Sequence, residues 1–319
     1  MPFVASGSYG CVFRPHLKCK NKKVYKNSVG KVFEDDTEFL IEKTLLETIQ
    51  KLDPDHTFTL VTLDSCRTDP ITRPSDGINN CELMDMSKRQ EYNQLIIEYG
   101  GKSLETLFLR KASSPRAFLK VFLSLQPLFE GLVMLSKNKL VHQDIKPDNI
   151  MLRKNKLYLI DFGILSHYDN VYVENNTLLA ADYPYFPPEY KLFDKKNVKS
   201  AHHFKTQYLN NFMYAIFISG RNVNLPLLIE KHLGINFDHE LSELYNASQD
   251  PSQDSTTTIN KIDSYQLGIT LFMLFVASDL PQGKYDPIKE LIKNMIQPNV
   301  HKRYTITEAY QAYMAIISN

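Results

Sequence analysis

Four polar residues in the middle of the chain have the types and spacing that phosphoryl transfer requires. Asp144 can orient an attacking hydroxyl and accept its proton, and Lys146, two residues later, can supply a cation beside the moving phosphate. Asn149 and Asp161 offer an amide oxygen and a carboxylate, which are the hard oxygen ligands that Mg²⁺ prefers. Taken singly, each of these residues after a strand makes an ordinary turn. Their ordered combination favours a site that handles a nucleotide and a metal ion.

The segments that carry these residues resemble two motifs of protein kinases. Val141–Asn149, with the sequence VHQDIKPDN, is similar to the kinase catalytic loop, and Ile160–Gly163, with the sequence IDFG, is similar to the D-F-G motif. The resemblance implies that Asp144 and Lys146 act in catalysis. It also implies that the asparagine and the second aspartate bind Mg²⁺, with Mn²⁺ as an alternative ion.

A glycine-rich turn opens the chain. Residues 5–12, with the sequence ASGSYGCV, resemble the kinase glycine-rich loop, in which glycines let backbone N–H groups approach phosphates without interference from a Cβ atom. The resemblance implies nucleotide contacts at Ala5, Gly7, Ser8, Tyr9, Gly10 and Val12. A turn of serine and glycine is common in any hairpin, so this assignment depends on the other matches.

Lys31 resembles the strand lysine of the kinase V-A-I-K motif, with Gly30 in place of the usual bulky residue. In the family this lysine pairs with a glutamate on the following helix. The residues after Asp35 predict that helix, because apolar side chains recur at helical spacing. These apolar positions are Ile41, Leu45, Ile49 and Leu52. Glu42 lies beside the stripe and is the predicted partner of Lys31, and Glu38 is the alternative.

Residues 95–100, with the sequence LIIEYG, resemble the strand that leads into the kinase hinge. By this match Ile97 lines the back of an adenine pocket. The backbone from Glu98 through Tyr99 to Gly100 is then predicted to bind the adenine edge. An apolar strand that ends in glycine needs no ligand to explain it, so this assignment also depends on the rest of the resemblance.

Three further matches concern residues that are structural in the family. Residues 187–189 resemble the A-P-E motif that closes the activation segment. Residues 263–268 resemble the D-V-W-S-L-G motif at the start of a helix in the large lobe. Arg303 stands where the family pairs an arginine with the glutamate of A-P-E, here Glu189. Small-molecule phosphotransferases that share the catalytic loop generally lack these features. The lysine two positions after the catalytic aspartate is the serine/threonine-kinase form.

Besides Gly30, the sequence departs from the family pattern at three further places. Gln143 replaces the arginine that receives an activating phosphate, which predicts activity without phosphorylation of the activation segment. Asp182 stands near a position where serine/threonine kinases have threonine, which leaves the geometry of the substrate loop open. An insertion at about 190–260 has aromatic residues at helical spacing. It is predicted to add a helix that packs on the large lobe, and a docking site for a substrate or partner is the alternative.

The elements that must position these residues indicate an α+β fold with two lobes. Short antiparallel strands and one helix are predicted for an N-lobe at 1–99, and a mainly helical C-lobe for 100–319. The resemblance implies that the two lobes form a single protein kinase domain. Ala117–Lys137 is predicted as one long amphipathic helix. Predicted C-terminal helices are Asp263–Ser278, Pro287–Ile296 and Ile306–Ile317.

The composition limits the classes of function. With 319 residues, 43% of them hydrophobic, and 37 basic against 36 acidic side chains, the chain can form a large core and lacks the broad positive charge of a nucleic-acid-coating protein. No nucleic-acid motif is present. Four cysteines without a CxxC pair predict neither disulfides nor zinc, and therefore a reducing, cytoplasmic setting. The most apolar stretch, Leu267–Ala277, is too short to span a membrane.

The resemblance implies an ATP- and Mg²⁺-dependent serine/threonine protein kinase that acts on protein hydroxyls. A nucleotide-binding scaffold without turnover, or a kinase of small molecules, are the alternatives. Residues 7–19, with the sequence GSYGCVFRPHLKC, resemble kinases encoded by large DNA viruses. That narrower match implies a viral protein in the host cytoplasm or the virion.

Overall fold

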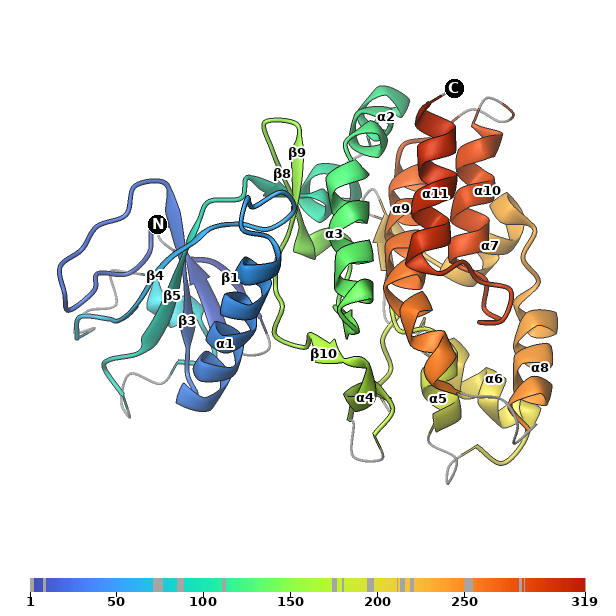
Figure 1. Cartoon of the computed structure of the whole chain (residues 1–319), viewed down its shortest axis with the longest axis horizontal. Coiled ribbons are helices and arrows are strands. Elements are labelled where there is room, and N and C mark those ends of the chain that lie inside the picture. Colours follow the sequence, from blue (N-terminus) through green and yellow to red (C-terminus); the bar gives the residue numbers. More distant parts are fainter. Residues whose placement is uncertain are drawn as a thin grey trace. The chain divides into compact units, whose positions relative to one another are not determined.

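A computed structural model gives the structure of the chain (Figure 1). It describes residues 3–7, 10–70, 77–84, 89–110, 113–173, 177–179, 181–193, 198–210, 212, 216–218, 221–249, 255–280, 283 and 285–318. The chain divides into two compact units, residues 1–101 and 102–319. Each unit is treated by itself below.

The first unit is a five-stranded antiparallel sheet with one long helix, α1, packed against β3 and β5. The strand order is β1, β2, β3, β5, β4. The elements of this unit are β1 (Phe3–Ser6), β2 (Gly10–Phe13), β3 (Ser28–Phe33), α1 (Asp36–Leu52), β4 (Thr62–Arg67), the 3₁₀ turn η2 (Ile78–Asn80) and β5 (Asn93–Glu98). The sheet places the glycine-rich turn and the strand lysine on neighbouring strands.

Helix α1 begins where the sequence predicts, but it turns a different face inward. The carboxylate of Asp35 caps it by accepting two backbone N–H groups of the first turn. The buried side chains are Phe39, Glu42, Leu46 and Ile49. Ile41 is 44% exposed, so the predicted apolar stripe is wrong at that position. Phe39 takes the inward position instead, because its ring packs edge-on against that of Phe33, with centroids 5.7 Å apart.

The four cysteines form two disulfides, so the prediction of unpaired thiols is wrong. Cys11 on β2 is bonded to Cys81, and Cys19 is bonded to Cys66 on β4. Cys19 comes beside β4 because it forms a β-bridge with Thr68. The sheet creates these pairs across separations of 70 and 47 residues, which sequence spacing does not reveal. Because the cysteines are paired, they no longer indicate a reducing compartment.

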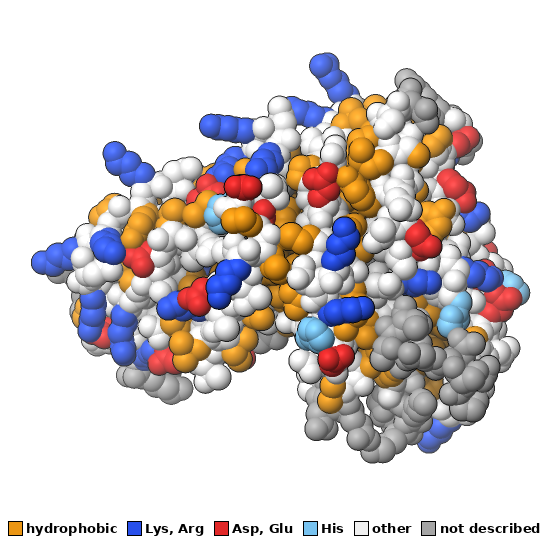
Figure 2. Space-filling view, viewed as in Figure 1, with side chains coloured by type: hydrophobic (Ala, Val, Ile, Leu, Met, Phe, Trp, Pro, Cys, Tyr) orange, Lys and Arg blue, Asp and Glu red, His pale blue; other side chains and the backbone are white. Residues whose placement is uncertain are grey.

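The loop between β2 and β3 is rich in exposed cations. Its lysines stand at positions 18, 20, 22, 23 and 26. Lys20 pairs with Glu91 at 2.7 Å, and Lys23 lies 3.6 Å from Asp64. Figure 2 shows Lys and Arg side chains interspersed with Asp and Glu side chains across the visible face. This mixed distribution agrees with the net charge of +1.

The second unit is mainly helical. Its helices are α2 (Pro115–Leu123), α3 (Gln126–Lys137), α4 (Tyr168–Val171), α5 (Glu189–Phe193), α6 (Ala201–Asn210), α7 (Leu225–Leu233), α8 (Phe237–Ser248), α9 (Ile262–Ala277), α10 (Asp286–Met295) and α11 (Ile306–Ile317). Shorter turns are the π-helix η3 (Glu105–Leu109) and the 3₁₀ segments η4 (Pro147–Asn149), η5 (Thr177–Leu179) and η6 (Ser255–Lys261). Its strands pair as β6 (Lys102–Ser103) with β8 (Ile150–Arg153) and β9 (Lys156–Leu159), β7 (Leu140–Val141) with β10 (Ser166–His167), and β11 (Ile216–Ile218) with β12 (Arg221–Val223). The α+β fold class is confirmed, and the three predicted C-terminal helices are α9, α10 and α11.

The predicted single helix Ala117–Lys137 is two helices, so that prediction is wrong. The hydroxyl of Ser124 bonds the carbonyl of Lys120 at 2.8 Å where α2 ends, and Pro127 occupies the first turn of α3. Proline suits a first turn but not a helix interior, which explains the break. In the described ranges no single helix is long and apolar enough to cross a membrane, although α2 and α3, bent by 45°, pass that test as a pair.

Helix α9 forms the core of the second unit, with 15 of its 16 residues buried. A Cβ atom at Gly268 would lie 2.5 Å from the side chain of Ile296, so glycine is needed for this close approach. The insertion packs on the same helix. Phe204 and Tyr208 of α6 are fully buried, and the hydroxyl of Tyr208 is hydrogen-bonded to that of Tyr265. Residues 201–210 therefore form a helix that packs on α9, as the aromatic spacing predicts, while the assignment of residues 190–260 as an insertion stays a prediction.

Candidate active site

The catalytic-loop segment is held by two polar side chains of the buried helix α9. Asp263 accepts the backbone N–H of His142 at 3.1 and 3.0 Å and that of Gln143 at 3.1 Å. Gln266 accepts the N–H of Ile145 at 3.0 Å and donates to the carbonyl of Gln143. Burial raises the pKa of Asp263 to about 6, although the two backbone N–H groups act in the opposite direction. The loop conformation is thus fixed from within the core.

The carboxylate of Asp144 is bound at both of its oxygens. Oδ2 accepts the ammonium of Lys146 at 2.9 Å and the side-chain amide of Asn149 at 2.8 Å. Oδ1 accepts the hydroxyl of Tyr183 at 3.2 Å. The backbone N–H of Asp144 also donates to the ring nitrogen Nδ1 of His142 at 3.2 Å. The two predicted catalytic residues therefore lie in direct contact, and their carboxylate has a fixed orientation.

The two predicted metal ligands lie at the same end of a hairpin. Asn149 immediately precedes β8, Asp161 follows β9, and the N–H of Ile160 donates to the carbonyl of Asn149 at 3.0 Å. The ring of Phe162 is buried against His142, with centroids 4.9 Å apart, which holds the D-F-G segment on the catalytic loop. The amide nitrogen of Asn149 is bonded to Asp144, so its amide oxygen is the atom suited to a cation. An amide oxygen and a carboxylate fit Mg²⁺ or Mn²⁺.

The structure pairs Lys31 with Glu42 and not with Glu38. The ammonium of Lys31 contacts both carboxylate oxygens of Glu42, at 2.8 and 2.7 Å, and Glu42 is 4% exposed. Gly30 beside this lysine has a packing reason. A Cβ atom at Gly30 would lie 2.4 Å from the side-chain amide oxygen of Gln94, which is on the neighbouring strand β5. The buried carboxylate of Glu42 therefore helps to hold the ammonium of Lys31 in place.

The nucleotide contacts predicted for residues 5–12 lie on β1, on β2 and in the sequence between these strands. Ala5 and Gly7 are exposed, Val12 is partly buried, and the N–H of Gly7 donates to the carbonyl of Gly10 at 2.9 Å. Ser8 and Tyr9 lie outside the described residues. A Cβ atom at Gly10 would lie 2.3 Å from the carbonyl oxygen of Val32, so a glycine is needed here for the close approach of β2 to β3. Of the residues between the two strands, the structure describes only Gly7.

The backbone donors of the predicted hinge are partly occupied. The N–H of Glu98 bonds the carbonyl of Val61 at 3.0 Å, and the N–H of Tyr99 bonds the carbonyl of Asn27 at 2.9 Å. The guanidinium of Arg14 lies over the Tyr99 ring, 3.3 Å from its centroid. Ile97, one residue earlier, pairs across the sheet with β3 and β4. The N–H groups of Glu98 and Tyr99, which the resemblance assigns to the adenine edge, are therefore hydrogen-bonded within the chain.

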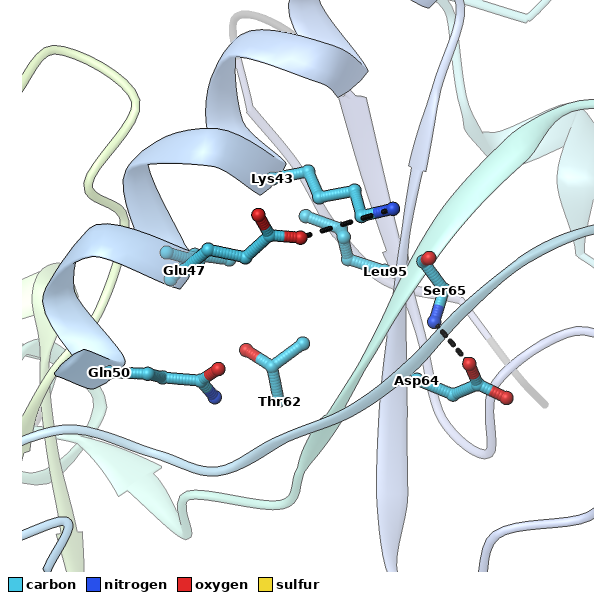
Figure 3. A pocket seen from close by; sticks show the side chains of 8 residues that line it. Lys43, Glu47, Gln50, Thr62, Asp64, Ser65 and Leu95 are labelled. Carbon is cyan, nitrogen blue, oxygen red and sulfur yellow. Dashed lines mark hydrogen bonds and ion pairs between the residues drawn. The ribbon is translucent and has the colours of Figure 1, made fainter. Parts of the chain in front are cut away.

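A small pocket of about 190 Å³ lies in the first unit between α1 and strands β4 and β5 (Figure 3). Its lining residues are Lys43, Leu46, Glu47, Gln50, Thr62, Asp64, Ser65 and Leu95. Pockets for drug-sized ligands enclose roughly 300–1,000 Å³. Its small volume, together with the absence of any sequence-predicted site residue from its lining, argues against this pocket as the nucleotide site.

An aromatic cluster holds the segment that follows D-F-G, and the sequence analysis missed it. Tyr190 donates its hydroxyl to the side-chain oxygen of Gln143 at 2.7 Å, and Gln143 donates to the carbonyl of Ile164 at 2.9 Å. Tyr172 stacks on Phe193 with ring centroids 3.7 Å apart. The position where the family has a phosphate-binding arginine is therefore filled by a glutamine that bonds to a buried tyrosine.

Comparison with known families decides the identity of this arrangement. The sequence model of the protein kinase domain matches residues 3–314. The chain belongs to the protein kinase family. This kinase is similar in fold to a crystal structure of the PF14_0431 kinase domain, with a TM-score of 0.51 and 14% identity over 97% of this chain and 92% of the other.

Short stretches of this kinase are similar to serine/threonine kinases. It is 40% identical over 81 residues to a probable casein kinase I homolog of Encephalitozoon cuniculi, which is 24% of this chain and 26% of that relative. It is 46% identical over 61 residues to the serine/threonine-protein kinase CAK1 of Saccharomyces cerevisiae, which is 17% of this chain and 15% of that relative. The kinase thus aligns with about a quarter or less of the length of these relatives.

Proposed function

We propose that this kinase transfers the γ-phosphate of ATP to serine or threonine hydroxyls of proteins. The observation that carries the proposal is the Asp144 carboxylate, held at one oxygen by Lys146 and Asn149. A carboxylate fixed in this way can orient an acceptor hydroxyl and take its proton, while the adjacent ammonium stabilises charge on the transferring phosphate. The similarity to serine/threonine kinases supports the choice of acceptor.

Each unit carries groups that suit one part of the nucleotide and its metal ion. Asn149 and Asp161 would hold Mg²⁺, which neutralises phosphate charge when bound. Lys31, oriented by two contacts to Glu42, would bind the α- and β-phosphates. A lysine already fixed by a buried partner loses little side-chain freedom on binding, which favours affinity.

We further propose that activity does not require phosphorylation of the activation segment. The hydrogen bond from Tyr190 to Gln143 and the packing of Tyr172 on Phe193 supply contacts that order this segment without a phosphate. A neutral glutamine cannot pair with a phosphate as arginine does. Aromatic packing and a neutral hydrogen bond thus take the place that a phosphate–arginine contact has in the family.

The test is incubation of the protein with γ-labelled ATP, Mg²⁺ and a mixture of basic, acidic and neutral proteins, followed by identification of the labelled amino acids. Label on serine or threonine supports the proposal. Nucleotide binding without transfer to any acceptor would overturn it in favour of a scaffold. Transfer only to added small molecules would overturn the choice of protein substrates.

A further inference from the structure

One contact to the proposed catalytic carboxylate comes from outside the catalytic loop. The hydroxyl of Tyr183 donates to Oδ1 of Asp144 at 3.2 Å, whereas Lys146 and Asn149 both bind Oδ2. The ammonium of Lys146 also lies 5.4 Å from the centroid of the Tyr183 ring. Tyr183 therefore touches both residues to which the proposed chemistry is assigned.

The surrounding side chains fix the position of Tyr183. Asp182, the residue before it, turns toward Lys191, whose buried ammonium lies 2.7 Å from the Asp182 carboxylate. The same ammonium donates to the carbonyl of Ala181 at 2.9 Å. The Tyr183 ring packs edge-on against that of Phe186, with centroids 4.9 Å apart. Lys191 thus holds the backbone and side chain just before Tyr183, and Phe186 holds the Tyr183 ring.

The protonation state of Tyr183 suits a donor. Burial raises the pKa of its phenol far above the usual value, and the nearby charge of Asp144 raises it further. The phenol therefore keeps its proton at neutral pH. A neutral hydroxyl beside a carboxylate can only donate to it, because an ionised carboxylate has acceptor atoms alone.

We infer that Tyr183 is a positioning residue for phosphoryl transfer, whose hydroxyl fixes the second oxygen of Asp144 so that this oxygen meets the acceptor hydroxyl. The inference rests on the proposed function. Each carboxylate oxygen has about two lone-pair directions, so Oδ1 can accept from Tyr183 and from a substrate hydroxyl at once. Asp182 does not contact Asp144 through any described hydrogen bond, and Tyr183 supplies the contact from the substrate loop.

Tyr183→Phe removes the hydroxyl and keeps the ring. We expect kcat to fall by about tenfold, because a hydrogen bond to a charged group is lost, while KM for ATP and for the protein substrate changes by less than about twofold. Tyr185→Phe is the matched control, because the buried hydroxyl of Tyr185 bonds Met273 Sδ at 3.4 Å. The control should keep the wild-type kcat.

Two measurements separate the outcomes. If the wild type is active, three results would overturn the positioning role and leave the proposed function standing. Tyr183→Phe could be as fast as the wild type, its loss of kcat could be matched by Tyr185→Phe, or its effect could be confined to KM. An inactive wild type would overturn the proposed function. In that case the ¹³C carboxyl resonance of Asp144, assigned by its loss in Asp144→Asn, still tests the contact. This resonance should shift in Tyr183→Phe and not in Tyr185→Phe. An unchanged resonance in Tyr183→Phe would refute the contact.

Discussion

Arg303 binds Glu189 through two buried hydrogen bonds, of 2.7 and 3.0 Å, and the two side chains are 0% and 3% exposed. The same guanidinium donates to the carbonyls of Gln297 and Pro298, so it ties α5 to the loop before α11. Removing one partner of such a pair leaves a buried charge without compensation.

We predict that Arg303→Met lowers the free energy of unfolding by about 3–5 kcal/mol, measured by urea denaturation, because Glu189 stays buried without its cation. Arg110→Met is the control, since Arg110 is 68% exposed in its pair with Glu105. The control should cost less than about 1 kcal/mol. Equal effects of the two substitutions would contradict this account of the buried pair.

The disulfides are predicted to stabilise the first unit. Cys19→Ser combined with Cys66→Ser opens a link across 47 residues, and we expect a loss of about 2–4 kcal/mol in the free energy of unfolding. Dithiothreitol should destabilise the wild type and leave a variant with all four cysteines changed to serine unaffected. Titration of four free thiols in the oxidised, folded protein would refute both links.

Acid should destabilise the fold through His142. Burial lowers the pKa of His142 from 6.5 to about 4 in the folded state, so the unfolded chain binds a proton more readily between these values. Stability from the neutral ring is therefore complete above pH 6.5 and is lost as pH falls toward 4. Relative to His142→Gln, which does not titrate, the wild type should lose up to about 3 kcal/mol between pH 7 and 4. A pH-independent difference between the two proteins would contradict the prediction.

Kinase activity should not require a phosphate on Tyr168, Tyr172 or Thr177 of the activation segment. Alanine substitutions would also remove packing contacts, because the Tyr172 ring stacks on Phe193. The informative variant therefore combines Tyr168→Phe, Tyr172→Phe and Thr177→Val, which delete the hydroxyl groups and keep the size of the side chains. We expect its rate of peptide phosphorylation to stay within about threefold of the wild type. Tyr190→Phe, which deletes the bond to Gln143, should be slower. A tenfold or larger loss in the triple variant would show that a phosphate is needed.

Sequence alone predicts those parts of the site that lie close together along the chain. Asp144, Lys146 and Asn149 share one loop, and their contacts follow from that short spacing. Helical geometry restricts the predicted partner of Lys31 to Glu38 or Glu42, and the resemblance to kinases favours Glu42, which the structure pairs with Lys31. Short spacing and the family resemblance together carry most of the catalytic constellation.

Contacts between distant segments could not be predicted in the same way. Tyr183 reaches Asp144 across 39 positions, and Cys11 reaches Cys81 across 70. No periodicity encodes such pairs, since they arise only when strands and loops pack. The inward face of α1 differs from the predicted one for a related reason, because the contact of Phe39 with Phe33 depends on how the helix packs on the sheet.

The rate of phosphoryl transfer in Asp144→Asn tests the central claim most directly. The amide keeps the size of the side chain but cannot accept the proton of the acceptor hydroxyl. We predict a fall in kcat of about 100-fold or more with unchanged affinity for Mg²⁺·ATP, while Asp286→Asn, whose side chain is 68% exposed on α10, keeps the wild-type rate. Transfer by Asp144→Asn at the wild-type rate would contradict the account.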